Sequence, residues 1–301
     1  MTTIATLLSG GECVGVGARE AGLTHLWGFE IENDIAQVAR DNGFNVITAD
    51  VMELDPTALE VPDVLHASPV CKRASLINND KGGKKEALED TAMGGKIAQF
   101  IDVMVPRVFT LENVYFYRNF EAFQIIISAL NRNGYMYHFE NVNSADFGVP
   151  QTRERLILRA VKNSLLSSFP PIQRWVSWME AIEDLMPSFE LWKLADWQKK
   201  ILPPSKPVLL IGNNQGGDER IRLSCVTPDK PSFTITVSNA AKNRILINGK
   251  VLRPTIRALA RLQSLPDSYR LPDNKETARK IVGNGVPALL YQKIIKPLAG
   301  S

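Results

Sequence analysis

The chain has 301 residues and a mass of 33.4 kDa, which is enough for one large domain and a smaller one. Apolar residues make up 45% and charged residues 22%, an ordinary globular composition that argues against a largely disordered chain. The formal net charge is only +3, so any nucleic-acid partner has to be held by a local basic face and not by a basic tail.

Cysteine and histidine usage narrows the class of protein further. The three cysteines (Cys13, Cys71 and Cys225) are widely separated, and the N-terminus lacks the charged and apolar regions of a secretory signal. We therefore expect a cytoplasmic protein. No Cys-x-x-Cys or His-x-x-x-His spacing occurs, so we expect no metal site. No apolar stretch approaches the ~20 residues that span a bilayer, so we expect no membrane partner.

The first half of the chain alternates short apolar runs with helical patterns, which predicts an α/β fold with a doubly wound, mostly parallel sheet. The expected strands are 4–9, 26–31, 45–48, 63–67 and 108–111. The expected helices between them are 14–21, 35–41 and 96–104. A helix over 120–132 and strands over 136–142 and 156–161 complete this part.

The second half has a different character. Residues 169–204 are rich in proline and contain Trp175, Trp178, Trp192 and Trp197, which we interpret as the core of a small module. A strand is expected within 207–217, a helix over 254–262 and a closing helix from about 286. We therefore predict a large domain over 1–161, a small domain over 162–250, and a return to the large domain over 251–301.

A cysteine and a glutamate follow two neighbouring strands of the predicted sheet. Cys71 ends the segment Ser68-Pro69-Val70-Cys71, and Glu112 opens the tripeptide Glu112-Asn113-Val114. The carboxyl ends of parallel strands share the edge where open α/β sheets place their chemistry. A lone cysteine is more often a buried structural thiol. A thiol that attacks an electron-poor ring needs a group that protonates the ring nitrogen, so this pair predicts covalent catalysis on a pyrimidine.

The end of the first predicted strand carries a glycine-bearing turn, residues 10–15, which lets backbone amides approach a ligand. It is not the G-x-G-x-x-G pattern of dinucleotide sites. Glu30 closes the second strand, where an acidic side chain can hold ribose hydroxyls, and Asp50 follows the third, suited to an adenine amino group. These features favour an adenosine-containing cofactor. S-adenosylmethionine fits better than NAD, because the turn is a poor match to the pattern that binds the pyrophosphate of a dinucleotide.

The segment Gln151-Thr152-Arg153-Glu154-Arg155 carries two arginines. If it is a strand, alternation puts Gln151, Arg153 and Arg155 on one face. Two guanidinium groups there suit a phosphate or a ring carbonyl oxygen. A salt-bridged surface strand is the alternative.

Taken in chain order, these motifs resemble the C5-cytosine DNA methyltransferase family along nearly the whole chain. Two further segments support the resemblance. One is Arg253-Pro254-Thr255-Ile256-Arg257, which leads into Leu262-Gln263-Ser264-Leu265-Pro266, and the other is Gly283-Asn284-Gly285-Val286. The sequence departs from the family pattern at Val70, where proline is usual, and at Lys72, where glutamine is usual. Neither departure removes a reacting group.

The resemblance implies the fold of S-adenosylmethionine-dependent methyltransferases and a DNA (cytosine-5-)-methyltransferase activity. Cys71 would attack C6 of a flipped-out cytosine, Glu112 would protonate N3, and C5 would take the methyl group. Arg155 and Arg153 would steady the base and the catalytic loop, and residues 162–250 would read the target sequence. The implied cofactor pocket comprises Leu8, Ser9, Gly10, Gly11, Glu12, Cys13, Val14, Gly15, Glu30, Ile31, Asp50, Val51, Ser68, Asn284 and Val286.

The resemblance also implies a set of partners. We expect a monomer that acts on double-stranded DNA, associates with the nucleoid when bound, and serves DNA methylation in restriction-modification. Two alternatives stay open at this point. One is a tRNA cytosine-5 methyltransferase, because one branch of the family takes that substrate. The other is a catalytically silent DNA-binding regulator of the same fold.

Overall fold

The computed structural model describes residues 1–69, 86–193, 207–213 and 222–299. The chain packs as two compact units. Unit 1 comprises Met1–Asn143, Glu154–Pro171 and Leu290–Ser301, and unit 2 comprises Ser144–Arg153 and Ile172–Leu289. These units are defined by packing, so the functional boundaries expected at 161 and 250 stay a prediction.

Unit 1 is built on a seven-stranded sheet with the order β3-β2-β1-β4-β5-β7-β6. Its strands are β1 (Thr3–Leu7), β2 (Thr24–Glu30), β3 (Val46–Thr48), β4 (Val64–Ala67), β5 (Val108–Asn113), β6 (Tyr135–Asn143) and β7 (Glu154–Lys162). Strands β1 to β5 pair in parallel, and β7 is antiparallel to both of its neighbours. The predicted α/β fold with a mostly parallel sheet is therefore confirmed. The strand order reverses between β1 and β4, which is where open α/β sheets bind ligands.

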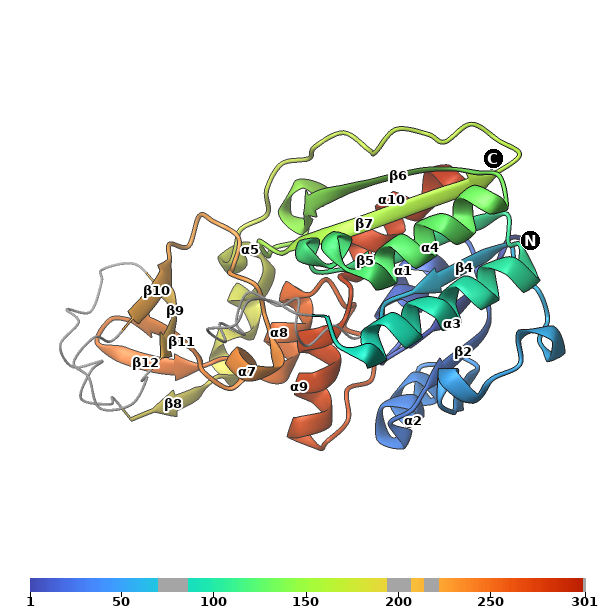
Figure 1. Ribbon diagram of the computed structural model, residues 1–301. Coiled ribbons are helices and arrows are strands. Elements are labelled where there is room, and N and C mark those ends of the chain that lie inside the picture. The colour runs from blue at the N-terminus through green and yellow to red at the C-terminus, as the bar shows by residue number, and fades with distance from the viewer. Residues whose placement is uncertain (70–85, 194–206, 214–221, 300–301) are drawn as a thin grey trace. The chain divides into compact units, whose positions relative to one another are not determined.

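Helices cover both faces of this sheet (Figure 1). On one face α3 (Leu88–Met104) and α4 (Glu121–Arg132) lie side by side, and the other carries α1 (Cys13–Glu20) and α10 (Ala288–Ala299). The remaining helix of the unit is α2 (Asn33–Asp41), and the short 3-10 turns are η1 (Val51–Glu53), η2 (Pro56–Ala58) and η3 (Tyr115–Asn119). Side chains from the sheet and from α3 and α4 form one large apolar core. Because both faces are covered, the central strands β4 and β5 are buried at every position.

The turn between β1 and α1 is built around a buried carboxylate. Glu12 caps α1 with a left-handed backbone (φ 58°), and its Oε2 accepts from the Gly15 amide at 3.2 Å. Its Oε1 accepts from the Thr6 hydroxyl and lies 3.0 Å from His25 Nε2. A Cβ on Gly15 would lie 2.5 Å from that carboxylate, and one on Gly28 would collide with it as well. Glycine at both positions therefore makes room for the Glu12 side chain.

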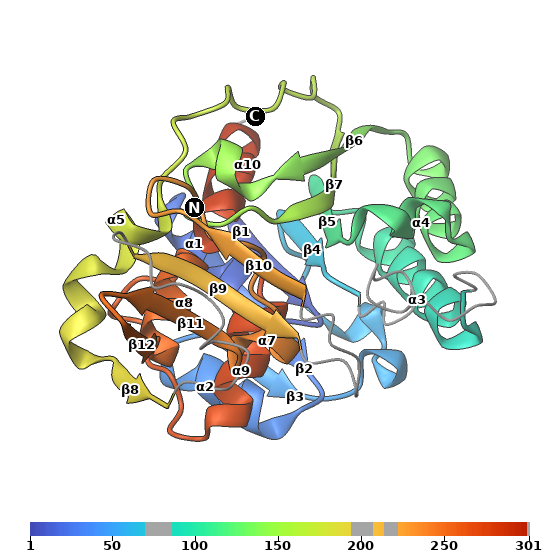
Figure 2. The same ribbon diagram turned by 90° about the vertical axis from the view of Figure 1, so that its left-hand side faces the viewer.

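Unit 2 carries a five-stranded antiparallel sheet with the order β10-β9-β11-β12-β8 (Figure 2). Its strands are β8 (Glu190–Trp192), β9 (Val208–Asn213), β10 (Arg222–Val226), β11 (Asn243–Ile247) and β12 (Lys250–Arg253). Its helices are α5 (Trp178–Ile182), α7 (Val237–Ala240), α8 (Ile256–Leu262) and α9 (Lys275–Asn284), with 3-10 turns η4 (Ser144–Phe147) and η5 (Glu183–Ser188). Helix α9 was not predicted from the sequence. Among the described residues, no helix combines the length and the apolar character needed to cross a membrane.

The structure corrects two expectations about this part of the chain. Trp178 is fully buried, as predicted, but Trp175 is 45% exposed and Trp192 is 40% exposed, so the core interpretation is wrong for them. Trp192 lies on the edge strand β8, and the guanidinium groups of Arg244 and Arg253 lie 4.3 and 5.0 Å from the centre of its ring. Trp197 lies outside the described residues.

The second correction concerns the segment with two arginines. Strand β7 begins at Glu154, so Gln151 and Arg153 do not share a strand face with Arg155. Gln151 instead forms an isolated bridge to Ser232. The reason is that the chain passes from unit 2 to unit 1 between Arg153 and Glu154, and each arginine packs in its own unit.

Candidate active site

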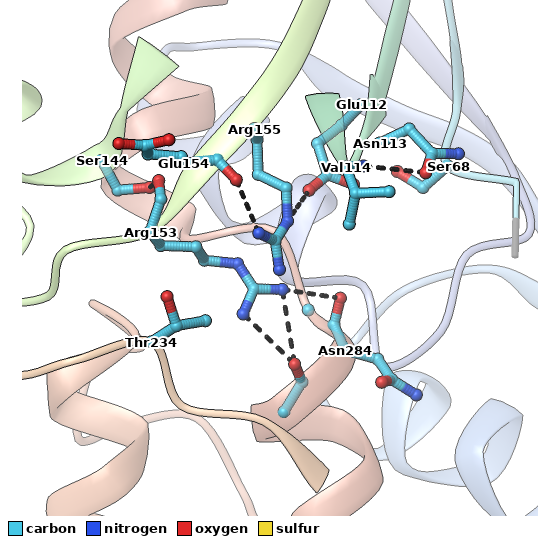
Figure 3. A network of polar contacts seen from close by, with 12 residues as sticks. Ser68, Glu112, Asn113, Val114, Ser144, Arg153, Glu154, Arg155, Thr234 and Asn284 are labelled. Atoms are coloured by element: carbon cyan, nitrogen blue, oxygen red, sulfur yellow. Dashed lines mark hydrogen bonds and ion pairs between the residues drawn. The ribbon is translucent and has the colours of Figure 1, made fainter. Parts of the chain in front are cut away.

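A buried ion pair lies at the carboxyl end of β5 in unit 1. Glu112 is 6% exposed, and its Oε1 lies 2.9 Å from Nε of Arg155 (Figure 3). The antiparallel register brings the first residues of β7 alongside the last residues of β5. Burial lowers the pKa of Arg155, and the Glu112 carboxylate opposes that shift. The pair therefore presents a fixed carboxylate at the sheet edge where the sequence predicted an acid.

The residue after this glutamate ties two strand ends together. Asn113 Nδ2 donates to the carbonyl oxygen of Pro69 at 2.9 Å, and its Oδ1 accepts from the Val114 amide at 2.8 Å. Pro69 follows β4 and precedes Cys71 by two residues in the sequence. Cys71 itself, together with Val70, Lys72 and the rest of 70–85, lies outside the described residues. The described end of β4 is thus held against the end of β5 that carries Glu112.

The glycine-bearing turn after β1 is joined to the end of β2 by a carboxylate. Glu30 Oε2 accepts from the Gly10 amide at 2.9 Å, and its Oε1 accepts from the Glu32 amide at 2.8 Å. Leu8 and Gly10 both adopt positive φ, 60° and 56°. The turn after β1 and Glu30, the acid predicted to bind the ribose, are therefore joined by a hydrogen bond.

The ends of β2 and β3 combine carboxylates with exposed apolar side chains. Asp50 Oδ1 accepts from the Met52 amide at 2.9 Å and so caps η1. Next to Glu30, Ile31 is 62% exposed, and Met52 after Asp50 is 39% exposed, whereas Val51 is buried. Acceptor groups beside apolar surface suit the hydroxyls and flat ring of an adenosine. Further residues of the predicted pocket, Glu12, Cys13 and Val14, point their side chains into the core, so only their backbone can face a ligand.

Three residues expected at the site lie in unit 2. Arg153 is 2% exposed and donates to the carbonyl oxygens of Ile235 at 2.9 Å, Gly283 at 3.3 Å and Asn284 at 3.4 Å. The side chain of Asn284 is exposed, and Val286 is buried. Figure 3 shows the Arg153 guanidinium directed at the main-chain oxygen of Asn284.

Comparison with known proteins decides the family. The model of the C-5 cytosine-specific DNA methylase family matches residues 2–299 of the chain. The chain belongs to this family.

Individual relatives agree with this assignment. The type II methyltransferase M.NgoBI of Neisseria gonorrhoeae is 28% identical over 93% of this chain and 87% of its own length. The type II methyltransferase M.HhaI of Haemophilus parahaemolyticus is 24% identical over 84% of this chain and 80% of its own length. The chain is a DNA (cytosine-5-)-methyltransferase, and the family predicted from its motifs is confirmed.

Solved structures support the fold. The Entamoeba histolytica methyltransferase EhMeth matches with a TM-score of 0.72 at 14% identity, covering 98% of this chain and 97% of that one. The S. pombe Dnmt2 methyltransferase matches with a TM-score of 0.69 at 15% identity, covering 99% of each chain. At these identities the likeness shows the fold alone.

Sequence reasoning missed a buried amide in unit 2 of this methyltransferase. Gln263 is fully buried, its Oε1 accepts from Gln151 Nε2 at 2.6 Å, and its Nε2 donates to the Gly285 carbonyl at 2.6 Å. Gln151 also accepts from the Ile235 amide at 2.8 Å. Gln263 lies in a segment that supports the family resemblance, but the sequence assigned it neither a role nor a partner. In the described part of the chain, no cluster of side chains could hold a metal ion.

Proposed function

We propose that this methyltransferase transfers the methyl group of S-adenosylmethionine to C5 of a cytosine flipped out of double-stranded DNA, through a transient bond to Cys71. The observation that carries the proposal is the buried Glu112–Arg155 pair at the end of β5. Asn113 links this end to the end of β4, and the chain reaches Cys71 two residues later.

The chemistry follows from the reactivity of the pyrimidine ring. The Cys71 thiolate adds to C6, and a proton delivered to N3 by Glu112 neutralises the charge that the addition pushes into the ring. S-adenosylmethionine supplies an electrophilic methyl group. C5 would take the methyl group with the electron pair of the former C5–C6 double bond, while the methyl–sulfur bond breaks and S-adenosylhomocysteine leaves. Loss of the C5 proton would then restore the double bond as the thiolate leaves, and N3 would return its proton to Glu112. A duplex base has to leave the stack for this to happen.

The arginine partner has a defined part in this scheme. Arg155 holds the Glu112 carboxylate in one orientation, and preorganised groups in a poorly hydrated site act more strongly than solvated ones. The catalytic role expected for Arg153 stays a prediction. Its hydrogen bonds to main-chain carbonyls favour a role in positioning the segment at Gly283.

The residues at the ends of β1, β2 and β3 fit the cofactor. We propose that Glu30 binds the ribose hydroxyls, that Asp50 binds the adenine amino group, and that Ile31 covers the ring. The support is the pair of hydrogen-bonded carboxylates at neighbouring strand ends and the 62% exposure of Ile31. The turn at residues 8–15 would approach the ligand through its backbone.

We further propose that residues 162–250 read the target sequence, because base readout needs side chains delivered into a groove. Among the described residues of this range, we propose the exposed Trp192 and the neighbouring Arg244, because guanidinium groups and aromatic rings both serve DNA binding. Type II relatives support a place in restriction-modification. A monomer in the cytoplasm, associated with the nucleoid through its substrate, completes the proposal.

Transfer of tritium from labelled S-adenosylmethionine to duplex DNA or to tRNA tests this function. We expect incorporation into DNA and a covalent complex with DNA that carries 5-fluorocytosine, whereas Cys71→Ala gives neither. Label in tRNA alone would favour the RNA enzyme, and no label in either substrate would favour the silent regulator. A denaturant-stable adduct with Cys71→Ala would remove Cys71 from the reaction.

A further inference from the structure

A chain of buried polar groups crosses unit 1 from α10 to the end of β4. The Tyr291 hydroxyl lies 3.1 Å from Thr110 Oγ1, Thr110 Oγ1 lies 2.8 Å from His66 Nδ1, and His66 Nε2 lies 2.8 Å from Ser68 Oγ. Tyr291, Thr110 and His66 are 0%, 1% and 2% exposed. The rings of His66 and Tyr291 meet edge to face, 4.9 Å apart. Groups this deeply buried have to find their partners within the protein.

Burial assigns a direction to these hydrogen bonds. Among the described residues, Thr110 Oγ1 is the hydrogen-bond partner of the Tyr291 hydroxyl, so Tyr291 has to donate to Thr110 or leave its own proton buried and unpaired. Thr110 then donates to His66 Nδ1. An imidazole that accepts at Nδ1 and is neutral carries its proton on Nε2. Burial lowers the pKa of His66 to about 3, so the neutral ring is the form present at physiological pH.

The direction continues to the sheet edge. His66 Nε2 donates to Ser68 Oγ, so the lone pair of Ser68 on that side is occupied and its own proton is directed elsewhere. Ser68 is partly exposed and follows β4, next to β1, at the position where the strand order reverses. The next residue, Pro69, is held through its carbonyl by Asn113. The Ser68 side chain and the Pro69 main chain are therefore both held in place at the end of β4.

We propose that Tyr291, Thr110 and His66 form a one-way hydrogen-bond chain that makes the Ser68 hydroxyl a dedicated donor to a hydrogen-bond acceptor of S-adenosylmethionine. This inference rests on the proposed function, because the cofactor is the acceptor. Thr110, His66 and Tyr291 touch no ligand and are positioning residues. Ser68 is the residue that contacts the cofactor.

The first test reads the direction of the chain without any ligand. The protein contains three histidines, so a sample labelled with ¹⁵N-histidine gives a simple spectrum, and His66→Gln assigns the His66 signals. We expect neutral His66 with the proton on Nε2 between pH 5 and 9. A proton on Nδ1, or a charged ring in this range, overturns the inference.

The second test measures binding of S-adenosylhomocysteine by calorimetry. Ser68→Ala should weaken binding about tenfold, the effect of one lost hydrogen bond. Thr110→Val keeps the shape but removes the hydroxyl, and should weaken binding about threefold. Thr110→Ser restores the hydroxyl and should recover most of the affinity. Ser128→Ala, which removes an exposed hydroxyl bonded within α4, is the matched control and should bind like wild type.

A double variant separates positioning from general damage. If Thr110 acts through Ser68, Thr110→Val should have no further effect on binding in the Ser68→Ala background. Additive losses, or a Ser68→Ala protein that binds as tightly as wild type, overturn the inference. A wild-type protein that neither binds S-adenosylhomocysteine nor methylates DNA overturns the proposed function instead, and the His66 spectrum still reports the direction of the chain by itself.

Discussion

The region around Glu112 and the region around Gly283 each hold one arginine of the segment 151–155, and they use it differently. In unit 1, Arg155 pairs with the Glu112 carboxylate at 2.9 Å. In unit 2, Arg153 donates to main-chain oxygens of Ile235, Gly283 and Asn284. The two side chains start two residues apart. Their environments differ because the chain changes units between them.

The arginine side chain therefore has a different role in each of the two regions. A guanidinium against a carboxylate fixes a charged group that can exchange a proton with a substrate. A guanidinium against carbonyl oxygens satisfies acceptors that burial would otherwise leave unpaired. We therefore expect substitutions around Glu112 to lower activity with little loss of stability. Substitutions around Gly283 should lower stability with little loss of activity beyond that of unfolding.

Glu112→Gln should have the largest effect on activity. We expect single-turnover methyl transfer to fall about 10²–10⁴-fold, because an amide cannot deliver the proton that a general acid supplies. The amide oxygen still accepts from Arg155, so the free energy of unfolding should fall by no more than about 1–2 kcal/mol. Rapid-quench kinetics and urea unfolding measure the two effects. Glu154→Gln, at the exposed first residue of β7, is the control. An unchanged rate in Glu112→Gln would show that Glu112 takes no part in the reaction.

Arg153→Met should show the opposite balance. The buried carbonyls at Ile235 and Gly283 lose a charged donor, which should lower the free energy of unfolding by about 3 kcal/mol. Urea unfolding followed by tryptophan fluorescence measures this loss, and methyl transfer should fall only in proportion to the folded fraction. If Arg153→Met is as stable as wild type and inactive, Arg153 belongs to the catalytic group as the sequence predicted.

Gly283→Ala tests how closely unit 2 packs at the end of α9. A Cβ there would lie 2.6 Å from the Thr236 carbonyl carbon and 2.8 Å from Val237 Cα, and backbone cannot move aside cheaply. We expect about 2 kcal/mol of destabilisation in urea unfolding. Gly95→Ala is the matched control in α3, where no atom lies within 4 Å, and should stabilise by about 0.5–1 kcal/mol. Equal stability of both variants would contradict the close packing.

The two regions also differ in how far the sequence predicts them. The strands that carry Glu30 and Glu112 near their ends were predictable, because parallel strands covered on both faces are rich in apolar residues and their ends carry the chemistry. The sequence did not predict that Glu112 pairs with Arg155. It also did not predict the partners of Arg153, because main-chain carbonyls that lie 82 and 130 residues from Arg153 have no side-chain signature.

Unit 2 was harder to predict for a physical reason. Its strands are short, and all three residues of β8 are exposed, so alternation between buried and exposed positions is weak. Two local signals of this unit are nevertheless present in its sequence. Asn248-Gly249 joins β11 to β12 with φ of 47° and 73°, and Asn-Gly between apolar runs is typical of a tight hairpin. Asn274, which caps α9 by accepting from the Glu276 and Thr277 amides, was a second signal.

Glu30→Ala gives the smallest expected effect. It tests whether cofactor binding and target recognition belong to different regions of the molecule. We expect the affinity for S-adenosylhomocysteine to fall about tenfold, because a carboxylate that binds hydroxyls is worth about one charge-assisted hydrogen bond. Glu30 also accepts from the Gly10 amide, so the loss could come from the turn and not from the ribose. Glu30→Gln keeps an acceptor for that amide, so its affinity should lie between the affinities of wild type and Glu30→Ala.

Calorimetry measures the affinities, and sequencing of DNA methylated by each variant reads the target. The target sequence should be unchanged, because we propose that residues 162–250 read it. A Glu30→Ala enzyme that binds the cofactor normally but methylates different sequences would contradict the division of work between the two regions.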